Sequence, residues 1–342
     1  MKFIATLGLC LIAGMASAQK VDLDRFNFNF EYRNLPHKPL DSSYTSFSVD
    51  LEASNYITGA MGTESIKSKI DLQGFERKEM DGDVQIKLRI QDLIVDKYQV
   101  VESSSTTKNK DGSETKTYSY YVSVDYSITG SADWSDNGGA ELAQGINLFS
   151  SRSYNWASAT YKTRSEANNY YENNRTALIN GFIRERLNEA INAANSKVNY
   201  YFGYPVSRNA ENLWLSDGKK HPETEAMTLR WTALKPALEA VSANELSQET
   251  ISKMTEMTKY FDDVKTRYTE DEKSHKKLRY AAWYNNAVLY LLMDMPEKAA
   301  EEARGLIAND YDAKDGEKLL EQAEALKALI ALNKTNTRHF RK

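Results

Sequence analysis

Two hydrophobic periods run along the chain, and the first repeats every two residues. Between residue 24 and about residue 169, apolar side chains alternate with polar ones, as in a strand with one buried face. The clearest examples are residues 26–32, 47–51 and 84–90. Ile70 and Leu72 are predicted to open a further strand, which the turn residues Asp81 and Gly82 connect to residues 84–90. This half is therefore predicted to be rich in antiparallel strands.

The longest predicted hairpin has its arms at residues 97–107 and 115–129. Its turn is formed around Lys110, Asp111 and Gly112, and the approach to the turn is rich in Ser and Thr. Such a segment can be a solvated loop or a projecting contact arm, and both readings remain open at this point. A last strand of this half is predicted at residues 154–161.

Near residue 170 the apolar positions change to steps of three and four residues. These steps run through Leu178, Phe182, Leu187 and Ile191, and they predict an amphipathic helix at residues 174–196. This helix is expected to cover one face of the sheet. Residues 198–222 are predicted to be irregular with at most one short strand, and they contain the best candidate for a domain boundary.

The remaining chain is predicted to be helical throughout. Apolar stripes with helical spacing mark five segments, at residues 227–241, 251–268, 278–293, 297–308 and 317–333. The predicted fold class is α+β, with an antiparallel β-rich N-terminal domain and a covering helix, followed by an all-α domain. The predicted division is a leader at residues 1–18, a β-rich domain at 19–220 and a helical domain at 221–342.

One helical hairpin, at about residues 278–311, resembles a tetratricopeptide repeat. The resemblance rests on an early Trp and a Tyr in the first helix, and on small or apolar residues where the two helices meet. These residues are Trp283, Ala287, Tyr290, Ala299, Ala303 and Leu306. The sequence departs from the repeat pattern at Asn286, where a hydrophobe is usual, and at Tyr311, where a closing Pro is usual.

The resemblance implies a module that binds peptides or other proteins and does not itself catalyse reactions. Because one repeat cannot bury its own face, the helices of residues 223–269 are interpreted as degenerate repeats. Residues 317–333 are interpreted as a capping helix. The alternative is a generic helical bundle in which one hairpin happens to fit the pattern.

The N-terminus has the pattern of an export signal. Lys2 precedes an apolar stretch at residues 3–15, and the small residues Ala16, Ser17 and Ala18 match a cleavage site after Ala18. Cleavage there would remove Cys10, the only cysteine of the chain. The mature protein would then have neither a disulfide nor a thiol, which favours a bacterial envelope protein, periplasmic or secreted.

Composition narrows the class of function further. The chain has 342 residues, 44 basic and 48 acidic side chains, and a net charge of −4. This balance argues against a nucleic-acid binder, which would need a basic surface, and we expect no nucleic-acid partner. Beyond the leader there is no long apolar run, so we expect no integral membrane insertion.

Catalytic motifs are nearly absent from the sequence. The four histidines, at positions 37, 221, 275 and 339, are far apart, and the chain contains no nucleophile elbow, P-loop or dinucleotide fingerprint. We therefore predict no catalytic residue and no cofactor. The one weak metal candidate is a calcium loop formed by Asp133, Ser135 and Asn137, which are spaced as oxygen ligands but lack the final acidic ligand.

These observations favour a non-catalytic, exported interaction or scaffold protein that binds another envelope protein or a peptide segment. The alternative is a glycan-binding envelope protein that uses a tyrosine-rich sheet face formed by Tyr118, Tyr120 and Tyr126, because aromatic rings stack on sugars. A hydrolase with an unrecognised pair of carboxylates is the third hypothesis, and nothing in the sequence points to a particular pair.

Overall fold

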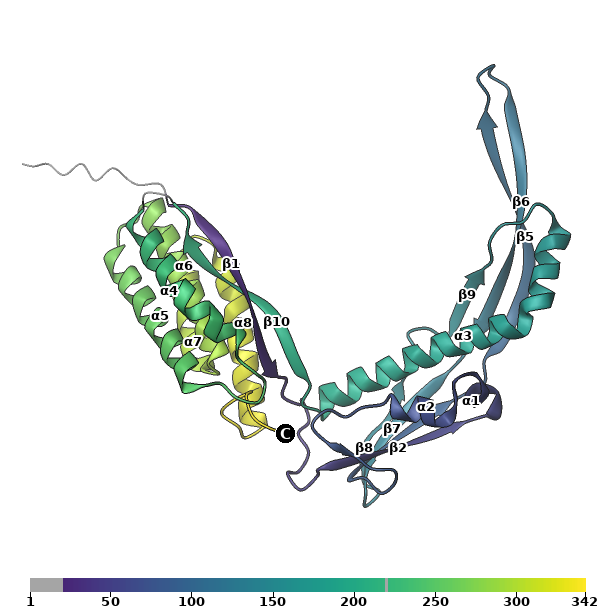
Figure 1. Cartoon of the computed structure of the whole chain (residues 1–342), viewed down its shortest axis with the longest axis horizontal. Helices are drawn as coiled ribbons and strands as arrows, with labels where there is room; N and C mark the ends of the chain where they lie inside the picture. The colour runs from purple at the N-terminus through teal and green to yellow at the C-terminus, as the bar shows by residue number, and fades with distance from the viewer. Residues whose placement is uncertain (1–20, 219–220) are drawn as a thin grey trace, which may run out of the picture. The chain divides into compact units, whose positions relative to one another are not determined.

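A computed structural model describes residues 21–218 and 221–342, and it has the predicted α+β fold (Figure 1). The predicted leader, residues 1–18, lies outside the described residues. The chain forms two compact units, which we call the sheet unit (residues 36–205) and the helical unit (residues 21–35 and 206–341). This division differs from the predicted boundary at residue 220, because the first and last strands of the chain pack with the helices.

The sheet unit is built around one long, bent hairpin. Its first half comprises β4 (Val84–Ile90) and β5 (Ile94–Lys108), and its second half comprises β6 (Glu114–Ser127) and β7 (Gly130–Asp136). Strand β4 pairs with β7 and β5 with β6, both antiparallel. Two shorter antiparallel strands extend this hairpin, β8 (Glu141–Asn147) beside β7 and β9 (Ser153–Ala157) beside β6. Tyr154 and Trp156 lie on β9 as predicted, whereas Tyr161 makes only an isolated bridge to Tyr120.

One side of this sheet is parallel, which the sequence pattern did not predict. Strand β2 (Ser46–Ala53) runs parallel to β4 and to the two-residue strand β3 (Glu76–Arg77). Parallel neighbours need a crossover connection, and the short helices α1 (Asn55–Met61) and α2 (Thr63–Ser68) provide it. The predicted strand at Ile70 and Leu72 is wrong. Both side chains are fully buried, but their segment is a loop docked on a helix.

That helix is α3 (Arg164–Tyr201), which covers one face of the sheet as predicted but is longer than residues 174–196. A capping box formed by Thr163 and Glu166 sets its start. Its C-terminal half holds the buried loop: the Asn199 side chain accepts from Gln73 N at 2.8 Å and donates to Asp71 O at 2.7 Å. The backbone groups that a strand would have paired are therefore satisfied by a helix side chain.

The described residues of the helical unit form a two-stranded ribbon and five helices. Strands β1 (Leu23–Arg33) and β10 (Val206–Ser216) pair antiparallel along their whole length, so the segment predicted to be irregular contains a strand of 11 residues. The helices are α4 (Pro222–Glu239), α5 (Gln248–Arg267), α6 (Lys273–Leu292), α7 (Pro296–Ala308) and α8 (Ala313–Leu332). Among the described residues, no helix combines the length and apolar character needed to cross a membrane.

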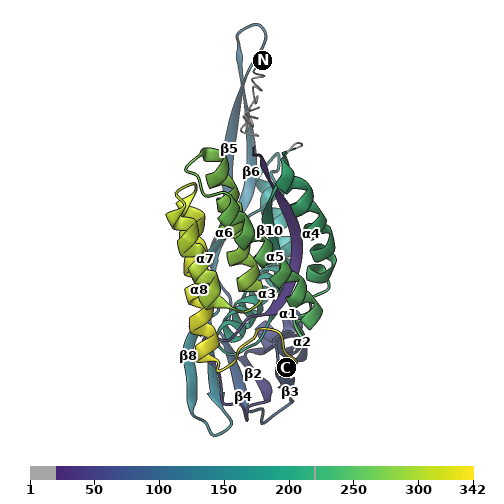
Figure 2. The same cartoon turned by 90° about the vertical axis from the view of Figure 1, so that its left-hand side faces the viewer.

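The ribbon of β1 and β10 lies across helices α4 and α6 (Figure 2). Phe28 packs edge-on against Trp231 of α4, with ring centroids 5.7 Å apart, and Leu213 and Leu215 are fully buried. Asn285 of α6 fixes β10 by accepting from Trp214 N at 2.8 Å and donating to Trp214 O at 2.7 Å. The surface formed by α4 and α6 is therefore occupied by the protein's own strands.

Candidate functional site

The most unusual surface feature is the distal part of the β5–β6 hairpin, residues 102–118, which we call the arm. Every residue of the arm is exposed. Below it, Val122 and Val124 of β6 are completely buried beneath α3. The arm extends beyond the beginning of α3, as Figure 1 shows. The sequence allowed two interpretations of this segment, a projecting contact arm and a solvated loop. In the structure it is an ordered ribbon of two paired strands.

Local interactions keep the arm paired although it is exposed. The strands stay in register from Glu102 opposite Tyr120 to Lys108 opposite Glu114. At the tip, Asn109 N donates to Ser113 O at 2.8 Å, and the Asp111 carboxylate accepts from Ser113 N and Ser113 Oγ. These bonds lower the pKa of Asp111, the hydroxyl bond contributing most. Thr-rich strands also favour extended backbone.

The outer edge of β5 carries backbone groups that face away from the hairpin. Val122 N donates to Ser158 Oγ at 2.9 Å and Val122 O accepts from Ser158 N at 2.8 Å, so the backbone of Val122 faces β9. Its partner Val100 must then face the open edge, and Arg164 Nη1 donates to Val100 O there at 3.3 Å. Because this orientation alternates along an antiparallel pair, the even-numbered residues 102–108 present their N–H and C=O groups on the same edge.

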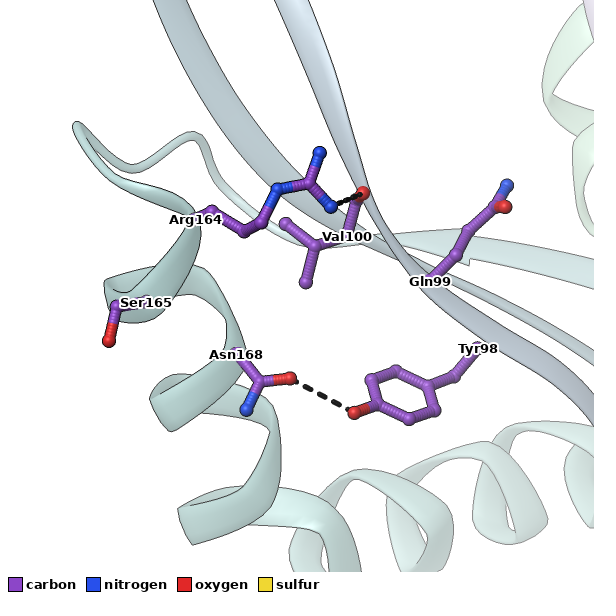
Figure 3. A pocket seen from close by; sticks show the side chains of 6 residues that line it. All are labelled: Tyr98, Gln99, Val100, Arg164, Ser165 and Asn168. Carbon is purple, nitrogen blue, oxygen red and sulfur yellow. Dashed lines mark hydrogen bonds between the residues drawn. The ribbon is translucent and has the colours of Figure 1, made fainter.

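An open hollow of about 620 Å³ lies at the base of the arm (Figure 3). It is lined by β5 and the first turns of α3, through Tyr98, Gln99, Val100, Arg164, Ser165 and Asn168. The single hydroxyl proton of Tyr98 is shared between two acceptors, Asn168 Oδ1 at 3.0 Å and Glu172 Oε1 at 3.1 Å from Oη, and the Glu172 bond raises the pKa of Tyr98. These contacts anchor the base of the arm to α3. Because Arg164 donates to Val100 O, the backbone acceptor of Val100 on the outer edge of β5 is already occupied.

The three tyrosines of the suggested glycan-binding face do not form one open strip. Tyr126 is buried and stacks on Phe182 of α3, with ring centroids 4.6 Å apart. Tyr120 is partly buried beside Arg164, whose guanidinium carbon lies 5.8 Å from the ring centroid. Only Tyr118 is well exposed, and it lies on the arm. Helix α3 therefore covers the Tyr126 end of the predicted tyrosine-rich face.

The residues proposed for calcium binding do not form a loop that surrounds an ion. Asp133 and Ser135 lie on β7, whereas Asn137 lies in the turn that follows. The Asp133 carboxylate forms an ion pair with Arg89 and accepts from Gly145 N at 2.9 Å. Within the described parts of the chain, one group of three potential ligand side chains comes together, Glu270, Glu272 and His275, with ligand atoms within 4.8 Å of one another. Both glutamates are exposed.

The open face of the sheet offers a second polar hollow, of about 520 Å³, over β2, β4 and β7. Two of its basic residues, Lys87 and Arg89, are engaged in ion pairs. Glu52 pairs with Lys87 at 3.0 Å and with Arg89 at 3.2 Å, and Arg89 also pairs with Asp133. The bond from Lys87 lowers the pKa of Glu52. Ion pairs of this kind are typical of the solvated face of a sheet. They do not form a pair of side chains in which one could act as a general acid and the other as a general base.

The residues that carry the tetratricopeptide resemblance lie in the packing between helices. Ala287, Ala299, Ala303 and Leu306 are fully buried, whereas Trp283 and Tyr290 are partly buried. A Cβ added to Gly305 of α7 would lie 2.5 Å from the Trp283 ring, so a small residue is required there. These side chains are structural. Asn285, which the sequence analysis did not single out, connects this hairpin to the ribbon.

No protein-family model and no curated protein matches this chain.

Proposed function

We propose that this chain is a non-catalytic, exported protein of the bacterial envelope, periplasmic or at the cell surface, and that it binds other envelope proteins as a scaffold. The observation that carries the proposal is the arm, residues 102–118, which stays paired while every one of its residues is exposed. A contact element needs a fixed shape and an accessible surface, and the arm has both.

The arm contributes little to the stability of its own unit. A two-stranded hairpin with no third strand or helix packed on it is marginally stable in water. Ordering its backbone costs entropy that no buried side chain of the arm offsets. Such a ribbon gains stability when a partner strand pairs with its edge or a partner surface covers one face. The structure of the arm is therefore best explained by a protein contact.

The chemistry of the arm suits a protein partner better than an ion or a nucleic acid. Its charged residues are Glu102, Lys108, Lys110, Asp111, Glu114 and Lys116, and they balance to zero. Most of the others are Ser and Thr, whose hydroxyl groups bond to backbone as donors or acceptors. A neutral ribbon with polar side chains recognises a partner through main-chain hydrogen bonds and shape.

We assign the helical unit a supporting role. The tetratricopeptide resemblance implies a peptide-binding surface, but the surface of α4 and α6 is covered by β1 and β10. A peptide could bind there only by displacing strands that bury Phe28, Phe30, Leu213 and Leu215. We therefore place the protein contact at the arm and not in a helical groove.

The experiment compares the mature protein, tagged at its C-terminus, with a variant whose arm is shortened, in the native envelope. Residues 104–118 are replaced by Asn-Gly, which joins the directly paired Ser103 and Ser119 by a two-residue turn. After mild crosslinking, mass spectrometry should show envelope proteins that the wild type enriches and the shortened variant does not.

A matched control replaces the exposed turn between β7 and β8, residues 137–140, which lies outside the arm. This control should keep all partners. Equal recovery of partners by the wild type and the shortened variant would show that the arm is not the contact.

Glycan binding is the weaker candidate, because Tyr126 is packed under α3 and only Tyr118 is well exposed. Retention of the same glycans on an array by both proteins would also exclude the arm tyrosines as its site.

A further inference from the structure

We propose that two copies of this chain associate through the outer edges of their β5 strands, so that the two arms form one four-stranded antiparallel sheet. The proposal rests on the proposed function, since it takes the arm to be a contact element, and it names the partner as a second copy. A self-complementary edge of this kind gives a closed, two-fold symmetric contact.

The usable edge has two structural limits. At its lower end, Val100 O is already occupied by Arg164. At its upper end, Asn109 turns into the hairpin tip, where its N–H is bonded to Ser113 O. Between these limits the edge runs from Glu102 to Lys108. Strand β5 is the outermost strand of its sheet, so no described strand pairs with this edge.

Two-fold symmetry and these limits define one register. If two identical strands pair antiparallel over the whole edge from 102 to 108, the symmetry axis passes through the central residue, Ser105. Glu102 of one copy then lies directly opposite Lys108 of the other, and this ion pair occurs twice. Ser104 lies opposite Thr106, which brings small hydroxyl side chains together. The register therefore pairs opposite charges and opposes no like charges.

The same stretch lacks the devices that usually prevent edge pairing. Proline and inward-facing charge are common on protected edges, and lysines are often placed along them. Residues 102–107 contain neither Pro nor Lys, and the bulge of β5 lies below the arm, between Val95 and Lys97. The one lysine of the edge, Lys108, lies 3.9 Å from Glu114 of its own hairpin and, in the proposed register, also faces Glu102 of the other copy.

A single-cysteine experiment tests the register directly. The only native cysteine, Cys10, belongs to the predicted leader, so a protein expressed from Gln19 contains no other thiol. In the proposed sheet, the two Ser105 residues form a non-hydrogen-bonded pair with Cα atoms about 4.5 Å apart, which a disulfide can bridge. Under mild oxidation, Ser105→Cys should form a disulfide dimer in high yield.

Thr117→Cys is the matched control, because Thr117 lies directly opposite Ser105 on β6 and is equally exposed. In the proposed dimer the two Thr117 residues are separated by three strand spacings, about 14 Å, too far for a disulfide. Ser105→Cys should therefore crosslink at least tenfold faster than Thr117→Cys at the same concentration. Equal rates would show random collision and would overturn the proposed pairing.

Charge exchange at two exposed positions provides a second, independent test. Lys108→Glu also faces Glu114 of its own hairpin, so the mixture of the two variants is the decisive comparison. Glu102→Lys alone and Lys108→Glu alone each place like charges opposite one another, so both should be monomeric in light scattering at a concentration where the wild type dimerises. An equimolar mixture of the two variants restores both opposite-charge pairs and should dimerise. A wild type that is monomeric at every concentration tested, or variants that dimerise as it does, would overturn the proposal.

These results can be separated from those of the proposed function. If Ser105→Cys does not crosslink, but shortening the arm still releases an envelope protein, self-association is wrong and the partner is a different protein. If Ser105→Cys crosslinks specifically while shortening the arm releases only the second copy, the contact is between copies of this chain. If shortening the arm changes neither, both proposals fail.

Discussion

Gly82 offers a sharp test of how closely the loop before β4 approaches β2. A Cβ added at Gly82 would lie 2.3 Å from Phe47 C and 2.4 Å from Ser48 N. These are backbone atoms of a strand whose side chains Phe47 and Val49 belong to the core, so they cannot move aside as a flexible side chain could. Overpacking of this kind usually costs about 1–3 kcal/mol, and a clash with backbone places Gly82→Ala at about 3 kcal/mol.

For a unit of this size, a loss of about 3 kcal/mol corresponds to a fall in Tm of roughly 6–12 °C. Differential scanning calorimetry of the mature protein would measure it, and hydrogen exchange should show faster exchange in β2. The control is Gly181→Ala, the same substitution in α3 of the same unit. No atom lies within 4 Å of the added Cβ there. Since Ala is about 1 kcal/mol better than Gly in a helix, this Tm should rise. An unchanged Tm for Gly82→Ala would refute the close approach.

Three further predictions concern buried charge in the helical unit. Asp294 is almost completely buried and accepts from Arg338 Nε at 2.5 Å, so Asp294→Asn should lower the free energy of unfolding by about 3 kcal/mol in urea titrations, against little change for Asp310→Asn. Burial lowers the pKa of His339, so stability should fall as the pH drops below about 6.5, and His339→Gln should flatten that slope. Burial alone would raise the pKa of Glu223, but hydrogen bonds from Tyr260, Arg267 and Tyr268 outweigh it and lower the pKa. Stability should therefore also fall below about pH 4.5, less steeply in Glu223→Gln, as acid titrations followed by circular dichroism would show. Identical pH profiles for wild type and variant would contradict either assignment.

The sequence predicted those strands and helices whose buried residues lie close together along the chain. Val84–Ile90 alternates strictly between buried and half-buried residues, and the spacing of Phe182, Leu187 and Ile191 predicted the helix that covers the sheet. The start of that helix was missed because residues 164–177 carry few apolar side chains, and its first turn is set instead by the capping box at Thr163.

Elements stabilised by distant partners could not be predicted in this way. Strand β10 lies in a segment predicted to be irregular with at most one short strand, because its pairing partner, β1, is about 170 residues away in the sequence. Ile70 and Leu72 are buried as their alternation suggested, but the backbone N–H groups of their neighbours Asp71 and Gln73 donate to Asn195 and Asn199 rather than to a strand. A local pattern reports that a side chain is buried and says little about what satisfies its backbone.

The candidate site was only half visible from the sequence. The Ser- and Thr-rich hairpin was identified, and its polarity correctly indicated exposure. The open edge of this hairpin was not predictable. Its position depends on the bonds of Ser158, which fix the direction of the Val122 backbone N–H and C=O groups, and on the bond from Arg164 to Val100 O. The exposed tyrosine-rich face is smaller than predicted, because the alternation of residues along β6 cannot show where α3 stops covering that strand.

The pairing of β1 with β10 makes the sheet unit an insertion within the helical unit. Arg33 and Val206 are direct cross-strand partners, so residues 34–205 form the loop of a β-hairpin. Closing a loop of ~170 residues costs roughly 3 kcal/mol more than closing one of four. The folded sheet unit offsets most of that cost, because its own bonds from His37 N to Tyr200 O and from Lys38 N to Tyr201 O bring its two ends together. During synthesis, all of residues 34–205 must therefore be made before the partner strand of β1 is available.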